Sequence, residues 1–118
     1  MPEAKDPFGN FVLQAIATFG APRYRRRLVE TICQDIEGFA YDRIASNVVR
    51  KVLRYSSLED QVALIDVVTS DPQRLGRFRK HKTGSFVLHE VRNVKTTLAL
   101  AGLPVGVQLT SSIMPTFS

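Results

Sequence analysis

The sequence has no tryptophan, one cysteine and only two histidines among its 118 residues. A single cysteine cannot form an internal disulfide, which excludes a disulfide-stapled secreted scaffold and favours a reducing compartment. Cys33 lies in an apolar run, so we interpret it as a small buried thiol and not as a nucleophile. Cys33, His81 and His89 have no recognisable zinc-ligand spacing, and we expect no metal.

The motifs of common catalytic sites are also absent. Neither pattern of the Gly-rich phosphate loops occurs, and the triplet Lys82-Thr83-Gly84 has no Ser-x-x-Lys to accompany it in a β-lactamase-type site. Glu59 and Asp60 stand at an expected helix start, where the helix dipole and capping explain paired carboxylates. We therefore expect no enzyme, no cofactor and no small-molecule substrate.

Long apolar runs are missing too. The segment 97–109 is mostly apolar, but Gly102, Pro104 and Gly106 interrupt it well short of the roughly 20 residues that a membrane span needs. The polar N-terminus, with two prolines in residues 1–7, resembles neither a signal peptide nor a transit peptide. We expect no membrane association and an intracellular protein, with residues 1–6 as an N-terminal segment and residues 101–118 as an irregular tail.

The chain does have enough apolar residues for one modest core, together with an excess of positive charge. At 118 residues and 44% hydrophobic composition it is long enough for one domain and too short for two. Sixteen Lys and Arg against eleven Asp and Glu give a net charge of +5. This balance favours polyanionic partners.

Three segments of the chain are similar to one another. Each has a very small residue, a polar residue, then Phe or Asn, two aliphatic residues and a long polar residue. The copies are centred on residues 10–14, 46–50 and 85–89, at intervals of 36 and 39 residues. An apolar stripe also recurs after 36 residues, in the pairs Leu28/Leu64, Val29/Ile65 and Ile32/Val68. A period in the thirties with helical stripes predicts an α-solenoid.

The predicted elements are all helices. We expect them at 8–18, 23–35, 37–42, 45–55, from a Ser57 N-cap to 69, and at 73–80, 85–92 and 94–100. The first unit has no obvious leading helix, and Leu103-Pro104 stands where the second helix of the third unit should follow. The extra three residues of the longer interval are expected between Val68 and Gly84. Residues 7–100 thus hold about two and a half to three repeats of about 36 residues.

The repeated polar positions have a defined geometry on a helix. Asn10 and Gln14 are four residues apart, so their side chains lie on one face, one turn from each other. The same spacing separates Ser46 from Arg50 and Ser85 from His89. Two hydrogen-bonding groups beside a flat side chain suit an unpaired base, which is held by its edge and stacked on its face.

Two segments, Phe8-Gly9-Asn10-Phe11-Val12-Leu13-Gln14 and Ala45-Ser46-Asn47-Val48-Val49, resemble the RNA-reading helices of Pumilio-family (PUF) repeats. Their order resembles the C-terminal repeats of a Pumilio homology domain, and the likeness covers Asp6 to about Asn93. The resemblance implies a curved, right-handed array of three-helix repeats that binds single-stranded RNA on its concave face, one base per repeat. It implies no catalysis.

The resemblance also implies a role for each motif position. The first and fifth positions contact the base edge: Asn10 and Gln14, Ser46 and Arg50, Ser85 and His89. The second positions, Phe11, Asn47 and Phe86, stack on the bases. The pair Asn10/Gln14 is the family's uracil-reading pair, whereas Ser46/Arg50 resembles a cytosine-reading pair at a place where a guanine-reading Glu is usual. No base is assigned to Ser85/His89.

Two basic clusters offer phosphate contacts, which raise affinity without reading sequence. We favour the cluster at residues 74–82, because it leads into the third motif, and interpret the cluster at residues 23–27 as a solvated face. The individual candidates are Arg43, Arg79, Lys80 and Lys82.

The resulting hypothesis is a sequence-selective module for single-stranded, uracil-containing RNA. It would act in cytoplasmic post-transcriptional regulation, through translation control at mRNA 3′-untranslated regions, with further PUF repeats or regulatory proteins as additional partners. The alternative is a divergent helical-repeat scaffold in protein interaction or in nuclear or nucleolar ribosome and RNA-processing assembly, with weak or no base specificity. RNA binding predicts that Arg50, His89 and the second basic cluster share a face with Asn10, whereas a scaffold predicts scattered charge and an exposed apolar patch.

Overall fold

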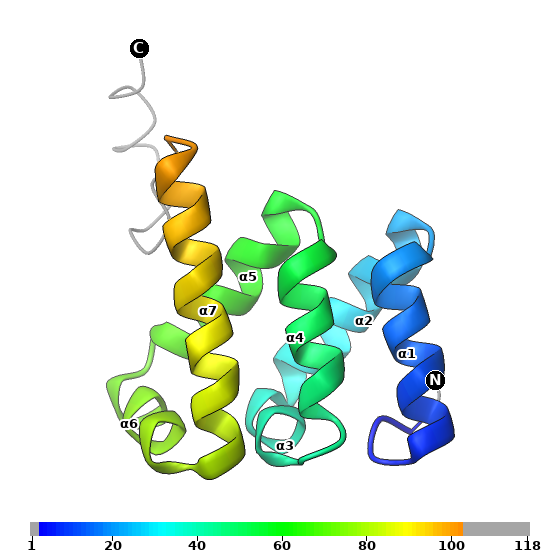
Figure 1. Ribbon diagram of the computed structural model, residues 1–118, viewed down its shortest axis with the longest axis horizontal. Helices are drawn as coiled ribbons and strands as arrows, with labels where there is room; N and C mark the ends of the chain where they lie inside the picture. The colour runs from blue at the N-terminus through cyan, green and yellow to red at the C-terminus, as the bar shows by residue number, and fades with distance from the viewer. Residues whose placement is uncertain (1–2, 103–118) are drawn as a thin grey trace.

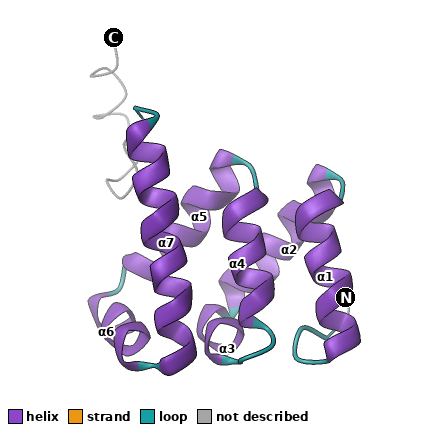
Figure 2. Cartoon of the chain, viewed as in Figure 1, coloured by secondary structure: helices purple, strands orange, loops and turns teal. Residues whose placement is uncertain are grey.

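Seven helices make up most of the part of the chain that the computed structural model describes, residues 3–102. They are α1 (Pro7–Phe19), α2 (Pro22–Gln34), α3 (Ile36–Tyr41), α4 (Ser46–Tyr55), α5 (Leu58–Thr69), α6 (Pro72–Lys80) and α7 (Lys82–Leu100). Figure 2 shows helices and short loops, and no strand, in these residues. The all-α prediction is confirmed.

The helices repeat in space as the motifs repeat in sequence. The motif helices α1, α4 and α7 stand side by side in one layer, α2 and α5 lie behind them, and the short helices α3 and α6 lie at one end of the layers (Figure 1). Helices α3, α4 and α5 form a complete unit. Within residues 3–102, the first unit is formed by α1 and α2 without a leading helix, and the third by α6 and α7. The predicted helical-repeat solenoid is therefore confirmed for the described residues, while the predicted break at Leu103-Pro104 lies outside them.

The residue four positions before the first polar position of each motif caps the backbone that leads into the motif helix. The side chain of Asp6 accepts a hydrogen bond from the backbone N–H of Phe8, and that of Asp42 accepts from Ile44 and Ala45. At the third unit the Nδ1 atom of His81 takes this place and accepts from the N–H groups of Thr83 and Gly84. These local caps satisfy amide groups that the helices leave unpaired and hold the three motifs in one register.

The core lies between the two layers. The predicted second stripe is buried in both units, at Leu28, Val29 and Ile32 on α2 and at Leu64, Ile65 and Val68 on α5. The motif helices contribute aliphatic residues of each motif, including Leu13, Val49 and Leu88, whereas Val12 of the first motif is exposed. Cys33 is half-buried against this core, and burial raises the pKa of its thiol. A raised pKa lowers the thiolate fraction and hence the reactivity.

Two predicted boundaries at the third unit are wrong. The helices expected at 85–92 and 94–100 form one helix, α7, which begins at Lys82 and continues to Leu100. Val91, Val94 and the half-buried Leu98 keep the buried stripe in helical register, and no Gly or Pro interrupts it. The three extra residues of the longer motif interval lengthen the leading helix of the third unit. Helix α6 has nine residues, whereas the equivalent α3 has six. The tail expected at 101–118 lies mostly outside the described residues.

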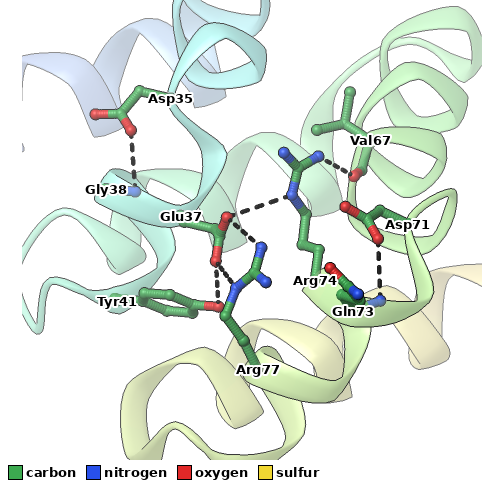
Figure 3. A network of polar contacts seen from close by, with 9 residues as sticks. All are labelled: Asp35, Glu37, Gly38, Tyr41, Val67, Asp71, Gln73, Arg74 and Arg77. Carbon is green, nitrogen blue, oxygen red and sulfur yellow. Dashed lines mark hydrogen bonds and ion pairs between the residues drawn. The ribbon is translucent and has the colours of Figure 1, made fainter.

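A carboxylate on α3 binds the two leading helices together (Figure 3). Glu37 accepts hydrogen bonds from Arg77 Nε at 2.7 Å and Arg77 Nη2 at 3.0 Å, and from the Tyr41 hydroxyl at 2.9 Å. Arg74 Nε lies 3.5 Å from the same carboxylate, and its Nη1 donates to the Val67 carbonyl. The Arg77 hydrogen bonds lower the pKa of Glu37 to about 2, against the opposing effect of burial. Burial, with this hydrogen bond, raises the pKa of Tyr41 to about 12.

This network gives a pH-dependent contribution to stability. Because the folded-state pKa of Glu37 lies below its ordinary value, its contribution is complete above about pH 5 and is lost as the pH falls toward 2. We expect Glu37→Gln to lower the free energy of unfolding by about 1–2 kcal/mol at pH 7, allowing for partial exposure of the pair. The difference from wild type, measured by urea denaturation, should shrink between pH 5 and 2.5.

The matched control for this prediction is Asp66→Asn, which removes an exposed carboxylate on α5. A Glu37→Gln deficit that stays constant across this pH range would contradict the assignment of the stabilisation to the ionised carboxylate.

Candidate nucleic-acid interface

The second motif positions lie exposed on one layer of helices. Phe11 on α1 is 72% exposed and Phe86 on α7 is 57% exposed, and Asn47 on α4, between them, is also exposed. All three helices run side by side in the layer seen in front in Figure 1. We call the surface formed by α1, α4 and α7 the motif face. It presents three flat side chains in the order that the repeat predicts.

A groove crosses the motif face between α4 and α7. It has a volume of about 430 Å³, with the Phe86 ring and the Asn47 amide among its walls. Cations come from both sides of the groove, namely Arg43 and Arg50 from the second unit and Lys82 from the third. A flat apolar group, an amide and three cations are the groups that bind a base together with its phosphate.

A second, smaller pocket lies between α1 and α4. It has a volume of about 200 Å³ and is lined by Gln14, Asn47, Arg50, Lys51 and Arg54. Asn47 and Arg50 line both pockets, so the two pockets are neighbours on either side of these α4 side chains. Gln14, Arg50 and Phe86, which are predicted site residues from three different motifs, thus line two neighbouring pockets.

A buried carboxylate lies beneath the cations of this groove. Glu90 on α7 is only 6% exposed and accepts a hydrogen bond from Arg54 Nη2 at 2.9 Å, while Arg50 Nε lies 3.9 Å away. The negative charge of Glu90 raises the pKa of Arg54. One buried acid therefore orients two guanidinium groups of α4 and offsets part of their charge.

Asn10 has a different environment from the one that the resemblance implies. It is 4% exposed, and its Nδ2 donates to the carbonyls of Ala4 at 3.2 Å and Ile44 at 2.6 Å. The half-buried Gln14 donates from Nε2 to the Asn10 Oδ1. Both amide hydrogens of Asn10 are thus in use within the protein. Its base-edge contact stays a prediction, and it would have to replace these bonds.

The serine positions are also turned inward. Ser46 is buried, and its hydroxyl donates to the Arg43 carbonyl at 3.2 Å. The Ser85 hydroxyl donates to the Lys82 carbonyl at 2.7 Å. The Ser46 hydroxyl thus closes the turn before α4 and the Ser85 hydroxyl bonds within the first turn of α7, while Arg50 and His89 at the fifth positions are exposed. The fifth positions are more available to a ligand than the first.

A very small residue precedes each of these polar positions for a steric reason. Gly9 lies directly against the backbone of Glu3, and a Cβ on Gly84 would lie 2.7 Å from the Tyr41 ring. The equivalent Ala45 is fully buried. Close packing therefore requires Gly at the start of α1 and α7, whereas the start of α4 accommodates the Cβ of a buried Ala.

The second basic cluster is divided by the fold. Arg74 and Arg77 bind Glu37 between the leading helices, whereas Arg79 and Lys80 are exposed near the end of α6. Of the individual phosphate candidates, Arg43 and Lys82 line the groove. The cluster was predicted as a whole to share the face of Asn10, but only Lys82 stands on a motif helix.

The first basic cluster lies on α2, in the layer behind the motif face (Figure 1). Arg26 Nε is 2.7 Å from the buried Asp60, and its Nη2 is 2.9 Å from Glu59. Arg25 donates to the Tyr55 carbonyl. These contacts join α2 to α5 and to the end of α4.

Sequence reasoning missed Arg54 and Glu90 as residues of the motif face. Arg54 follows Arg50 by four residues, so a helix presents both on one side. Glu90 carries a charge within the apolar end of the third motif. The available signal was that Glu90 stands at a buried position of the helical pattern and Arg50 and Arg54 lie on one side of the neighbouring helix.

Between residues 3 and 102 no group of three His, Cys, Asp or Glu side chains could hold a metal ion. In the same range no helix has the length and hydropathy needed to cross a membrane.

Comparison with known proteins identifies the repeat. Residues 4–33 and 36–69 match the family model described as the Pumilio-family RNA binding repeat. The two matches together cover more than half of the chain and correspond to α1–α2 and α3–α5. No match was found among the curated proteins.

Proposed function

Because the chain belongs to the Pumilio family of RNA-binding repeat proteins, we propose that its motif face selects single-stranded RNA by base and acts in post-transcriptional mRNA regulation in the cytoplasm. The family is non-catalytic, and the motif face carries a groove and no catalytic constellation that we recognise. RNA binding is the family's property. Base selection, the uracil-containing target and the regulatory role are the parts that we propose.

The two neighbouring pockets on either side of α4 are the observation that supports this proposal. Successive flat side chains at Phe11, Asn47 and Phe86 lie in the order in which one base per repeat would stack. Gln14, which offers an amide, lines only the pocket between α1 and α4, whereas Arg50, which offers only donors, lines both pockets. The two pockets therefore present different sets of hydrogen-bonding groups. Different groups at successive pockets are what base selection requires.

The assignment of bases follows the fifth positions, which are more exposed than the first positions. Gln14 can both donate to and accept from a uracil edge, whereas Arg50 requires an acceptor-rich edge, as cytosine or guanine provides. We place uracil at Gln14 and cytosine or guanine at Arg50, and assign no base to His89. The candidates for phosphate contacts in the groove are Arg43 and Lys82.

The test measures base preference directly. Fluorescence anisotropy with short labelled RNAs, at fixed moderate salt, compares the four bases at the position opposite Gln14. We expect uracil to be favoured by about tenfold in Kd, and Gln14→Ala to remove this preference, because one or two base-edge hydrogen bonds contribute about 1–2 kcal/mol.

The control variant is Gln34→Ala, which truncates an exposed glutamine at the end of α2, away from the motif face. It should keep the uracil preference. Binding that is equal for all four bases in wild type would overturn base selection and favour the scaffold alternative.

A further inference from the structure

The buried Asn10 amide has no hydrogen left to offer to a base. Its Nδ2 group carries two hydrogens, and both are used on backbone carbonyls, those of Ala4 and Ile44. Its oxygen, Oδ1, accepts from Gln14 Nε2. These bonds fix the orientation of both amides, because Asn10 can present only its oxygen to Gln14. The donor that the resemblance assigns to Asn10 is therefore missing at the base edge.

Gln14 alone can satisfy only part of a uracil edge. One hydrogen of its Nε2 group binds Asn10, which leaves one hydrogen and the Oε1 atom for a ligand. A uracil edge has two carbonyl oxygens that accept and, between them, one N–H that donates. Gln14 Oε1 can accept from this N–H, and the remaining Gln14 hydrogen can bind one carbonyl. The second carbonyl of the base still needs a donor, since an unpaired carbonyl would weaken the preference for uracil.

Arg50 is the donor in the pocket between α1 and α4 that is free to supply this bond. It makes no hydrogen bond within residues 3–102, and the carboxylate that faces it lies 3.9 Å away, beyond hydrogen-bond distance. The other two cations of the pocket are engaged. Arg54 donates to the same carboxylate at 2.9 Å, and Lys51 Nζ lies 5.6 Å from the centre of the Tyr55 ring. The remaining amide, that of Asn47, stands at the predicted stacking position.

The same arginine also lines the pocket between α4 and α7, together with Phe86. We propose that Arg50 is shared between two consecutive bases, donating to the second carbonyl of the uracil at Gln14 and to the base that stacks on Phe86. This inference rests on the proposed function and departs from one base per repeat, because residues of two motifs then read the uracil. A free guanidinium has to be ordered before it can bind a base. Once one base has ordered Arg50, the other binds without that cost, so the two base preferences are coupled.

The first test is Arg50→Met, which removes every donor of this exposed side chain but keeps it unbranched. In the anisotropy assay, the preference for uracil opposite Gln14 should fall from about tenfold to about threefold or less. The matched control, Lys51→Met, removes another cation of the same pocket. It should weaken binding equally for all four bases and keep the uracil preference. A preference that survives Arg50→Met would overturn the shared role and leave the proposed function standing, whereas a wild type without any preference would overturn both.

The second test measures the coupling in wild type. The RNAs carry uracil or adenine opposite Gln14 and, at the neighbouring position opposite Phe86, cytosine or an abasic nucleotide. We expect the uracil preference to be at least about threefold greater beside cytosine than beside the abasic nucleotide. Arg50→Lys keeps the charge but not the planar fork of donors. Its affinity at low salt should exceed that of Arg50→Met, while the coupling is lost. An equal uracil preference beside both neighbours in wild type would show that each pocket acts alone and would overturn the shared role.

Discussion

Replacing Asn10 by alanine is expected to lower the free energy of unfolding by about 2–3 kcal/mol, whereas Gln14→Ala is expected to cost less than about 1 kcal/mol. The two side chains form one hydrogen-bonded pair, and the resemblance gives both the same role at a base edge. Their surroundings differ. Asn10 is buried, while Gln14 borders the pocket between α1 and α4.

The expected cost follows from where the Asn10 hydrogen bonds go. Its amide joins the segment before α1, through the Ala4 carbonyl, to the turn before α4, through the Ile44 carbonyl. Alanine would leave these two carbonyls without a partner at a site with little access to water. An unpaired buried carbonyl costs more free energy than its hydrogen bond contributes net. Losing the Gln14 amide leaves the Asn10 oxygen in need of a donor, which water from the adjacent pocket can supply.

Urea denaturation followed by circular dichroism measures both changes, with Asn93→Ala as the control for an exposed asparagine on a motif helix. If Asn10→Ala unfolds at the same urea concentration as Asn93→Ala, then Asn10 is not held as described. The base-edge role that the resemblance implies would then be the better explanation of the residue.

Replacing Glu90 by glutamine is expected to have the largest effect on RNA binding, and in the direction of tighter binding. The substitution keeps the shape of the side chain but removes a negative charge beneath Arg50 and Arg54. The two guanidinium groups then act on the phosphates without an acid to offset them. We expect a gain of about three- to tenfold in affinity at low salt, lost as the salt concentration rises.

The same variant should lose stability and selectivity. Arg54 and Glu90 form a partly buried pair across α4 and α7, and breaking it is expected to cost about 1–3 kcal/mol. With its ion pair lost, Arg50 samples more rotamers, so the tighter binding should discriminate less between bases. Anisotropy titrations at two salt concentrations with matched and mismatched RNAs measure both effects.

The control for the charge change is Glu30→Gln, which removes an exposed carboxylate from α2, in the layer behind the motif face. The overall charge rises by the same amount in both variants. An equal gain in affinity from Glu30→Gln would show that net charge is the cause, and would remove Glu90 from the binding site.

Periodicity was sufficient to predict the repeat, because the information is local. The motif spacing and the recurring aliphatic pairs, such as Leu28/Leu64, need only a helix of regular pitch to place side chains on known sides. The same holds for Ser57, which caps α5 as expected, since a cap depends on residues within one turn.

Contacts between units could not be predicted in this way. Glu37 and Arg77 are 40 residues apart, and their pairing depends on how α3 packs against the lengthened α6. This pairing removes Arg77 from the cluster that sequence reasoning assigned as a whole to RNA. The burial of Asn10 likewise depends on Ala4 and Ile44, which lie in segments outside the motif. Helical periodicity places Asn10 beside Gln14, but it does not show whether a segment from elsewhere in the chain buries Asn10.

The unit-to-unit contacts also determine how the chain can fold. Most of the side-chain hydrogen bonds that join neighbouring units link residues 30 to 40 positions apart, as between Arg25 and Tyr55 or between Glu37 and Arg77. Each such contact closes a loop of about one unit, so no large loop-closure entropy has to be overcome at once. Folding can nucleate in the complete unit, α3–α5, and extend to either end. A low contact order of this kind corresponds to folding within milliseconds or faster, so the finished array forms without a topologically slow step.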